Sequence, residues 1–278
     1  MRFENTWTGN WENAFRGLRH PMESYAKSDS AFGIADNDVW FSEIASDVAY
    51  SYVQDKENFE EERDNTIDWL FNNGALRYGK YAGEYAFLGP NDIDLAQRMI
   101  KAGSPNDKFL RQIFVSVDIT GPLYWWKELD TYKIGTTANS TSTMHKLAST
   151  PITIDCFEIN DLSDENLPIG NYNCLKFMYN QIIDDCESLR QKYLETKDIR
   201  YWKELIRWLP ESWLQTRTFT CNYAVLRNIV KWRKNHRLKY EWDSFIQWCQ
   251  TLPYSLELIF YENGYENEYK LHNLLSSK

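Results

Sequence analysis

The sequence lacks the short motifs that mark the commonest phosphate, nucleophile and metal sites. It has no GxSxG, no P-loop pattern, no GxGxxG and no CxxC. Its four histidines are too scattered for a metal motif such as HExxH; they are His20, His145, His236 and His272. We therefore expect no metal site, and a function has to be sought in residues that carry no such signature.

A long apolar run is also missing. No stretch approaches the roughly 18 apolar residues of a membrane span, and the N-terminus has no apolar core of a secretory signal. Positive charge is scarce, with 31 Lys and Arg against 40 Asp and Glu, a net charge of −9 and a pI near 5.1. Broad binding to nucleic acid or to an anionic membrane needs the opposite balance. We expect a cytoplasmic protein with neither partner, in which an anionic ligand needs a local basic pocket.

The cysteines and the aromatic residues point to the interior of the protein. Five cysteines form an odd set whose spacing matches no zinc or disulfide framework, so we predict reduced core residues. The 12 tryptophans and 18 tyrosines combine an apolar ring with a polar group. They are expected either to line a pocket for a flat ligand or to pack the core. The cysteines are Cys156, Cys174, Cys186, Cys221 and Cys249.

Hydrophobic periodicity predicts a single α+β domain over residues 1–278, with a strand-containing middle and a helical C-terminal half. Residues 1–35 are polar and predicted to be irregular, and the acidic run 55–65 is typical of a solvated helix face. A surface helix packed on its Leu95 and Met99 side is expected over 91–103. Strands are predicted at 112–120 and 151–157. Further helices are predicted at 173–194, with a core stripe through Leu175, Met178, Ile182, Cys186, Leu189 and Tyr193, and at 199–209, 222–235 and 241–250.

The helix over 222–235 carries an arginine on its apolar face. At 100° per residue, Arg233 falls on the side of Leu226 and Ile229, whereas Arg227, Lys231 and Lys234 fall on the opposite, solvated side. A guanidinium cannot lose its proton, so an inward arginine needs an anion or a carbonyl as partner. Arg233 is therefore expected to form a structural salt bridge, to extend its side chain to water at the helix end, or to bind a ligand such as a phosphate or a pyrimidine edge. Asn222 shares the face at roughly 16 Å, too far for one phosphate to bridge the two.

A second candidate is the Ser/Thr-rich stretch within 124–150, which begins beside Trp125 and Trp126. Hydroxyls, backbone N–H groups and Lys133 are suited to surround a phosphate without a glycine-rich motif. The stretch is equally consistent with a polar surface loop. His145, which closes the loop, is the histidine of most interest.

Residues 216–233, TRTFTCNYAVLRNIVKWR, resemble the flavin-dependent thymidylate synthases (ThyX). In that family a conserved Asn is followed eleven residues later by an Arg that contacts the dUMP base, and Asn222 and Arg233 match this pair. The family's Arg at +2 and His at +6 are replaced by Ala224 and Asn228. The signature RHRxxSxxxxSxR is absent, and its place falls at 130–144, where Ser140 or Ser142 matches its serine. The resemblance to the family covers residues 107–250, and residues 1–90 match no part of it. The chain is also similar to ThyX-like proteins of bacteria and their phages.

The resemblance implies a ThyX-like fold with a central, mainly antiparallel sheet and long helices, assembled as a homotetramer that binds FAD and a pyrimidine nucleotide such as dUMP. It implies a methyltransferase in which a one-carbon unit is transferred to C5 of the base, with NADPH and methylene-tetrahydrofolate as co-substrates, in a bacterial cell or a phage-infected host. The alternatives are a nucleotide-binding or nucleotide-sequestering protein without catalysis, and a structural protein. The implied catalytic residues are Arg233, Ser140 and Ser142; the cofactor-binding residues are Asn222, Asn228 and Lys133; and the substrate-binding residues are Arg233, Arg217, Tyr132, Asn139 and His145.

Overall fold

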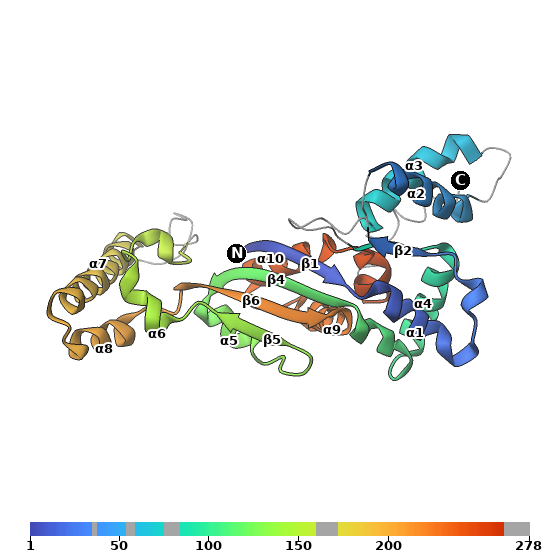
Figure 1. The fold of residues 1–278 in the computed structure, drawn as a ribbon. Coiled ribbons are helices and arrows are strands. Elements are labelled where there is room, and N and C mark those ends of the chain that lie inside the picture. The colour runs from blue at the N-terminus through green and yellow to red at the C-terminus, as the bar shows by residue number, and fades with distance from the viewer. Residues whose placement is uncertain (35–37, 54–58, 75–83, 160–171, 264–278) are drawn as a thin grey trace. The chain divides into compact units, whose positions relative to one another are not determined.

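The computed structural model describes residues 1–34, 38–53, 59–74, 84–159 and 172–263 (Figure 1). The fold is α+β with a mainly antiparallel sheet, as predicted. The strands are β1 (Arg2–Gly9), β2 (Ala31–Ile34), β3 (Glu84–Phe87), β4 (Phe114–Pro122), β5 (Thr137–Ser140) and β6 (Leu214–Asn222). The α-helices are α1 (Trp11–Arg19), α2 (Asp38–Tyr52), α3 (Phe59–Gly74), α4 (Pro90–Ala102), α5 (Leu123–Leu129), α6 (Thr143–Lys146), α7 (Tyr172–Thr196), α8 (Ile199–Trp208), α9 (Tyr223–Arg233) and α10 (Lys239–Gln250).

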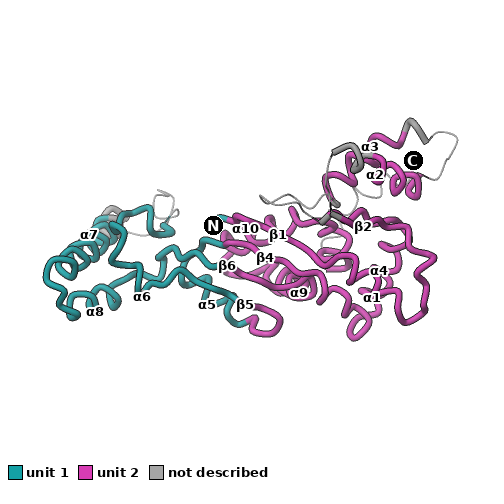
Figure 2. Tube along the Cα trace, in the orientation of Figure 1, with its two compact units in different colours: residues 1–2, 119–131, 138–218 teal, residues 3–118, 132–137, 219–278 magenta. Residues whose placement is uncertain are grey.

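The chain divides into two compact units, shown in different colours in Figure 2. Unit 1 comprises Met1–Arg2, Ile119–Thr131 and Ala138–Thr218. Unit 2 comprises Phe3–Asp118, Tyr132–Thr137 and Phe219–Lys278. The boundary between the units passes through strands β4 and β6, so each of these strands contributes residues to both.

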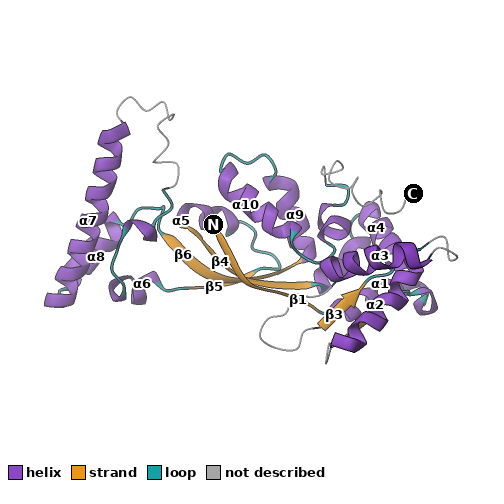
Figure 3. Ribbon diagram, turned by 90° about the horizontal axis from the view of Figure 1, so that it is seen from above, coloured by secondary structure: helices purple, strands orange, loops and turns teal. Residues whose placement is uncertain are grey.

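Four strands form one sheet in the order β1-β4-β6-β5, and β2 pairs with β3 antiparallel in a second sheet. Hydroxyl contacts fix the pairing of β4 with β6: Ser116 lies 3.1 Å from Thr220, and Thr120 lies 2.7 Å from Thr216. Because the residue numbers run in opposite directions, this pair is antiparallel. The predicted strand at 112–120 is confirmed, since Val115, Val117 and Ile119 are buried while Phe114 is 43% exposed. Within unit 2, helices α9 and α10 lie along one side of the sheet (Figure 3).

Each of the two paired strands leads directly into a helix. The Leu123 N–H, at the start of α5, donates to the Trp213 carbonyl at 3.1 Å. The Tyr223 N–H, at the start of α9, donates to the Ile113 carbonyl, also at 3.1 Å. Both bonds continue the register of the hydroxyl pairs, so the register of the two strands fixes where both helices begin.

The N-terminal part is more regular than predicted. Residues 1–35 contain β1, α1, two short 3-10 turns and β2 instead of an irregular segment. In α1 the buried residues are Trp11, Ala14, Phe15 and Leu18. They are spaced as on one face of a helix, but the polar residues between them hide this pattern in the sequence. The acidic run 55–65 falls partly outside the described residues, and its remainder belongs to α3.

Helix α4 confirms the element predicted at 91–103, but the predicted packing side is wrong. Asp92, Ala96 and Ile100 are buried, whereas Leu95 and Met99 are only partly covered. The reason is an ion pair: Arg19 Nε donates to Asp92 at 2.6 Å, and the side chains are 5% and 0% exposed. The Ser28 and Ser30 hydroxyls also donate to Asp92, both at 2.6 Å, so the carboxylate is satisfied inside unit 2.

The strand predicted at 151–157 is wrong. The segment forms a 3-10 turn at Ile154–Cys156, followed by an isolated bridge between Phe157 and Trp213. Ile152 and Phe157 are buried and Ile154 is 43% exposed, so the apolar residues do not share one face of a strand. The turn buries the two outer residues and leaves the middle one in solvent.

The helices predicted at 173–194, 199–209, 222–235 and 241–250 correspond to α7, α8, α9 and α10 and are confirmed. The core stripe predicted on α7 is confirmed in part, because Cys186 is buried and Ile182 and Leu189 pack against the core of unit 1. Tyr179 is partly covered, and Ile183, Cys186 and Arg190 are buried, whereas Met178 is 53% exposed. Ile182, Leu189 and Tyr193 are half-buried, and the side chain of Leu175 lies outside the described residues.

Four of the predicted reduced cysteines are free thiols, and Cys186, Cys221 and Cys249 are buried. Burial raises the pKa of the Cys186 thiol to about 11, so it is held protonated. The side chain of Cys174 lies outside the described residues. Within the described part of the chain, no helix is long and apolar enough to cross a membrane.

We predict that Glu187 makes unit 1 sensitive to acid. Hydrogen bonds from Arg190 are the largest cause that lowers the Glu187 pKa from 4.5 to about 2, with further bonds from the Ile152 N–H and Gln191. A lowered folded-state pKa gives stability that is complete above pH 4.5 and is lost as the pH falls toward 2. Glu187→Gln should therefore lower the free energy of unfolding at neutral pH by about 2 kcal/mol and flatten its decline in acid.

Urea unfolding between neutral pH and pH 2 measures this effect. Glu195→Gln, on the same helix, is the matched control, because the Lys192–Glu195 pair is 59% and 61% exposed and contributes little. Equal pH dependence in wild type and Glu187→Gln would contradict the assignment.

Candidate functional site

The candidate site in unit 2 is built on α9. The Asn222 side chain accepts a hydrogen bond from the Val225 N–H at 3.1 Å and caps the first turn of the helix. Tyr223, Leu226, Ile229 and Val230 are buried against the core, and the Tyr223 hydroxyl donates to the Pro253 carbonyl at 2.6 Å. The helix is therefore fixed along its length, and its last residue is Arg233.

The Arg233 guanidinium lies against two aromatic rings. Its central carbon is 5.2 Å from the centre of the Tyr132 ring and 4.8 Å from that of Trp242, which is fully buried. Arg233 itself is half-buried. Aromatic faces attract a guanidinium through their quadrupole without neutralising its charge. Arg233, which was predicted to lie on the apolar face of the helix, thus contacts two aromatic rings that helical spacing alone does not predict.

Tyr132 reaches Arg233 from a loop that lies along α9. The Thr136 hydroxyl donates to the Tyr132 carbonyl at 2.5 Å and closes the loop. Gly135 has a φ of +76°, and a Cβ at this position would lie 3.1 Å from Val225 Cγ2 and 3.2 Å from Asn222 Nδ2. Glycine is required here by both its backbone conformation and the close approach. The loop brings Tyr132 to Arg233 and Gly135 to Asn222.

The sequence around this site is basic in an acidic chain. Residues 219–240 contain six Lys or Arg and no Asp or Glu. The turn after α9 is ordered by backbone bonds, with the His236 N–H donating to the Arg233 carbonyl and the Leu238 N–H donating to His236 Nδ1, both at 3.1 Å. The His236 ring meets Trp242 edge to face at 5.9 Å. Aromatic rings and fixed positive charge therefore meet at the end of α9.

The prediction that Arg227 lies on the solvated side of the helix is wrong. Its guanidinium donates to the Ile259 carbonyl at 3.0 Å and to the Tyr261 carbonyl, and Asn263 Nδ2 donates back to the Arg227 carbonyl at 2.9 Å. Its side chain is half-buried. The helix turns Arg227 toward the chain that follows α10, and the arginine holds that segment in place.

Arg217, predicted to bind substrate, belongs to a network in unit 1. It donates to both Asp130 oxygens at 3.0 and 3.1 Å and to the Gln215 side chain at 2.9 Å, and it stacks on Trp126 at 4.4 Å. Gln215 Nε2 in turn donates to the Thr141 carbonyl at 2.9 Å. These contacts tie β6 to the chain that follows α5, which is a structural use of Arg217.

The other predicted residues of the Ser/Thr-rich loop also lie in unit 1. Asn139 and Ser140 are exposed on β5. Ser142 caps α6 by accepting from the His145 N–H at 3.2 Å, and the His145 side chain is exposed. The structure brings Arg233 together with Tyr132, and Ser142 together with His145; the roles proposed for these residues stay predictions.

The predicted cofactor residues lie on α9 and on the loop that contacts it. Asn222 is buried beneath the Gly135 loop, Asn228 is exposed on a different face of α9, and Lys133 is exposed. Six residues of helix separate the two asparagines by about 9 Å. The role of these three residues in binding a flavin stays a prediction. Among the described residues, no group of His, Cys, Asp and Glu could hold a metal ion.

Trp242 is the residue of this site that the sequence analysis missed. It lies on α10, nine residues after Arg233, and helical spacing in α9 says nothing about it. Trp125 and Trp126, by contrast, are fully buried and pack edge to face at 5.0 Å, so they are core residues. The only signal in the sequence was a tryptophan, Trp242, shortly after the basic turn. This signal does not indicate that Trp242 contacts Arg233.

We predict that Asn222 stabilises the helix through its cap. Asn222→Ala should lower the free energy of unfolding by about 1 kcal/mol, because the Val225 N–H loses its acceptor. Asn222→Asp keeps an acceptor at the same place and should restore most of the loss. Urea unfolding compares the three proteins, and equal stability of wild type and Asn222→Ala would show that the cap is not a significant contributor.

Comparisons with known proteins give similarity at the level of backbone arrangement. The sequence matches no protein-family model and no curated protein. Two structures of ThyX from Helicobacter pylori complexed with FAD and dUMP are 17% and 18% identical, each covering 63% of this chain and 84% of the other, with a TM-score of 0.44. The UMP/dUMP methylase PolB from Streptomyces cacaoi, bound with 5-Br UMP, is 15% identical over the same shares, with a TM-score of 0.46.

Proposed function

We propose that the chain binds a pyrimidine nucleotide of the dUMP type at Arg233, as a diverged relative of the flavin-dependent thymidylate synthases. The observation that carries the proposal is the Arg233 guanidinium between Tyr132 and Trp242. The matching of Asn222 and Arg233 to the family's Asn and Arg supports the choice of ligand. Neither feature depends on catalysis.

The electrostatics favour an anionic ligand at this place. An acidic protein repels nucleotides over most of its surface, so binding needs a local excess of positive charge. The segment 219–240 supplies it, with Lys231, Arg233 and Lys234 at the C-terminal end of α9 and Arg237 and Lys239 after the turn. The aromatic rings hold the Arg233 side chain in one direction, which reduces the entropy that is lost when a ligand binds.

Arg233 would act on the ligand through its N–H groups. A guanidinium presents planar donors that match the carbonyl edge of a uracil ring or a phosphate, and a lysine cannot reproduce this geometry. At a carbonyl edge, the fixed charge also polarises the ring toward greater electron density at C5. Binding and polarisation are the two contributions that this chain's own residues make in the proposal.

Thermal stabilisation by dUMP tests the proposal. A ligand that binds only the folded protein adds RT ln(1 + [L]/Kd) to its stability, about 2.7 kcal/mol at a hundredfold excess over Kd. Wild type should show this gain, and Arg233→Ala should lose it almost completely. Arg233→Lys keeps the charge without the planar donors and should retain only a small part.

Arg98→Ala is the matched control, because this exposed arginine of α4 belongs to the same unit but lies outside the basic segment 219–240. It should keep most of the dUMP response. Urea unfolding without ligand checks that the Arg233 variants fold. An unchanged dUMP response in folded Arg233→Ala would rule out the site, and unfolding of both variants would identify Arg233 as a structural residue.

Transfer of a one-carbon unit to C5 is the finer proposal and would need FAD, NADPH and methylene-tetrahydrofolate. We propose binding as the primary function, because the observation that carries the proposal, Arg233 against Tyr132 and Trp242, concerns ligand binding and not redox chemistry. The visible absorbance of oxidised flavin in the purified protein separates the two functions. Yellow protein that methylates dUMP supports the synthase, whereas colourless protein that dUMP still stabilises supports a nucleotide-binding protein without catalysis.

A further inference from the structure

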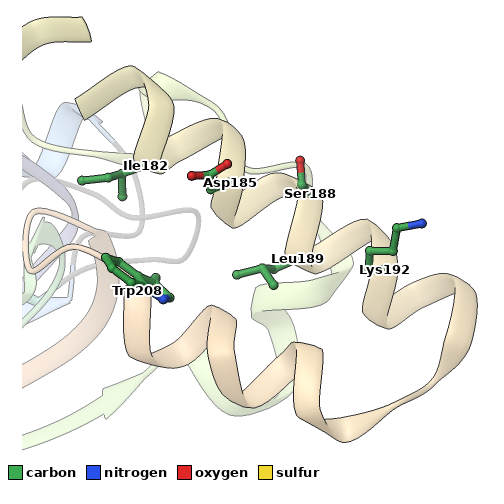
Figure 4. Close-up of a pocket in the computed structure, with 6 residues that line it drawn as sticks. All are labelled: Ile182, Asp185, Ser188, Leu189, Lys192 and Trp208. Atoms are coloured by element: carbon green, nitrogen blue, oxygen red, sulfur yellow. The ribbon is translucent and has the colours of Figure 1, made fainter. Parts of the chain in front are cut away.

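A groove on the surface of unit 1 runs between α7 and α8. Its volume of about 420 Å³ lies within the range of roughly 300–1,000 Å³ that is usual for small-molecule sites. Two of its apolar residues, Ile182 and Leu189, are half-buried and also pack against the core of unit 1, so the fold holds them in place. The groove is lined from α7 by Ile182, Asp185, Ser188, Leu189 and Lys192, and from α8 by Trp208 (Figure 4).

Trp208 places an aromatic ring at one end of the groove. It lies across from Ile182 and Asp185, whereas Lys192 lies farther along α7 at the other end (Figure 4). Trp208 is 60% exposed, so its ring is accessible to a ligand. An indole is the aromatic group that attracts a cation most strongly over its face. Helix α8 therefore supplies an aromatic ring opposite a carboxylate of α7, and both groups are suited to an ammonium ion.

The charges along the groove are not balanced at the Trp208 end. Lys192 Nζ lies 3.3 Å from a Glu195 oxygen, so the lysine has a counter-charge of its own. Asp185 accepts a hydrogen bond from the neutral Gln181 amide at 3.2 Å, and it forms no ion pair with any residue that the structure describes. Lys192 follows Asp185 by seven residues, about 10 Å along the helix, so the two are not in contact. A negative charge is thus available beside the ring, in a chain whose net charge of −9 attracts cations.

We propose that this groove binds a small organic cation, a primary alkyl- or arylammonium ion. The ammonium group donates to the Asp185 carboxylate beside the Trp208 ring, and the apolar body of the ligand covers Ile182 and Leu189. A charge-assisted hydrogen bond sets the orientation of the ligand, and the covered apolar surface contributes to its affinity. The site uses residues of unit 1 alone and takes a ligand whose charge is opposite to that of a nucleotide, so the proposal goes beyond nucleotide binding.

Calorimetric titration of the full chain with phenethylammonium tests the proposal. Wild type should bind this ion at least about tenfold more tightly than 2-phenylethanol, which has the same apolar body without the charge. Asp185→Asn keeps the size of the side chain and removes its charge, so it should abolish this preference and leave the binding of 2-phenylethanol nearly unchanged. Trp208→Leu keeps an apolar side chain without an aromatic face and should weaken the binding of phenethylammonium about threefold.

Asp184→Asn is the matched control, because this exposed carboxylate is the neighbouring residue on α7 and is turned from Asp185 by about 100°. It should keep the affinity of wild type for phenethylammonium, and Lys192→Met should bind the ion no more weakly. Circular dichroism checks that each variant is folded.

Two results would overturn the proposal directly: wild type that does not bind phenethylammonium, or folded Asp185→Asn that binds it as tightly as wild type does. A third concerns the other end of the groove. Tighter binding of 3-phenylpropionate, an anion with the same apolar body, that is lost in Lys192→Met would show that the groove takes anions and not cations. The dUMP response of the Asp185 variant should equal that of wild type, so the two proposals succeed or fail separately.

Discussion

The antiparallel pairing of β4 with β6 is the constraint on which the other features depend. The contacts of Ser116 with Thr220 and of Thr120 with Thr216 belong to one register, and the backbone bonds that begin α5 and α9 continue it. A slip by one residue would turn every side chain of a strand to the other face. It would also move the Asn222 cap, and with it the direction in which every residue of α9 points. The position of Arg233 therefore follows from the strand register that precedes the helix.

The sequence predicted the elements better than it predicted their packing. Alternation over 112–120 and the helical spacings of α7 to α10 are local signals, and the structure confirms them. Which face of a helix is buried depends on partners elsewhere in the chain. On α4 the ion pair with Arg19 turns Asp92 inward against the hydrophobic pattern. On α7 the predicted stripe lies at the edge of the buried face. The spacing of apolar residues within α7 does not indicate on which side α8 packs.

The candidate site shows the same limit more sharply. The stripe of α9 predicted that Arg233 points inward, and it does, but the stripe contains no information about Tyr132 or Trp242. Tyr132 is brought there by a loop about a hundred residues earlier in the chain, and its path depends on Gly135. For Arg227 the same reasoning predicted the wrong environment, since the chain at Ile259 and Tyr261 covers a face that periodicity marks as solvated. Hydrophobic periodicity is a property of one helix, whereas the burial of a side chain depends on every segment that packs against that helix.

Two arginines of one helix thus show two uses of the same group. Arg227 directs its donors at carbonyl oxygens, which satisfy a guanidinium and fix a neighbouring segment. Arg233 has its guanidinium against the ring faces of Tyr132 and Trp242, which attract a cation through their quadrupole. Contacts with aromatic rings restrict the directions that a guanidinium can take, and they leave its planar donors suited to a carbonyl or phosphate oxygen. The contact of Arg233 with two aromatic rings is the observation on which we propose nucleotide binding at the end of α9.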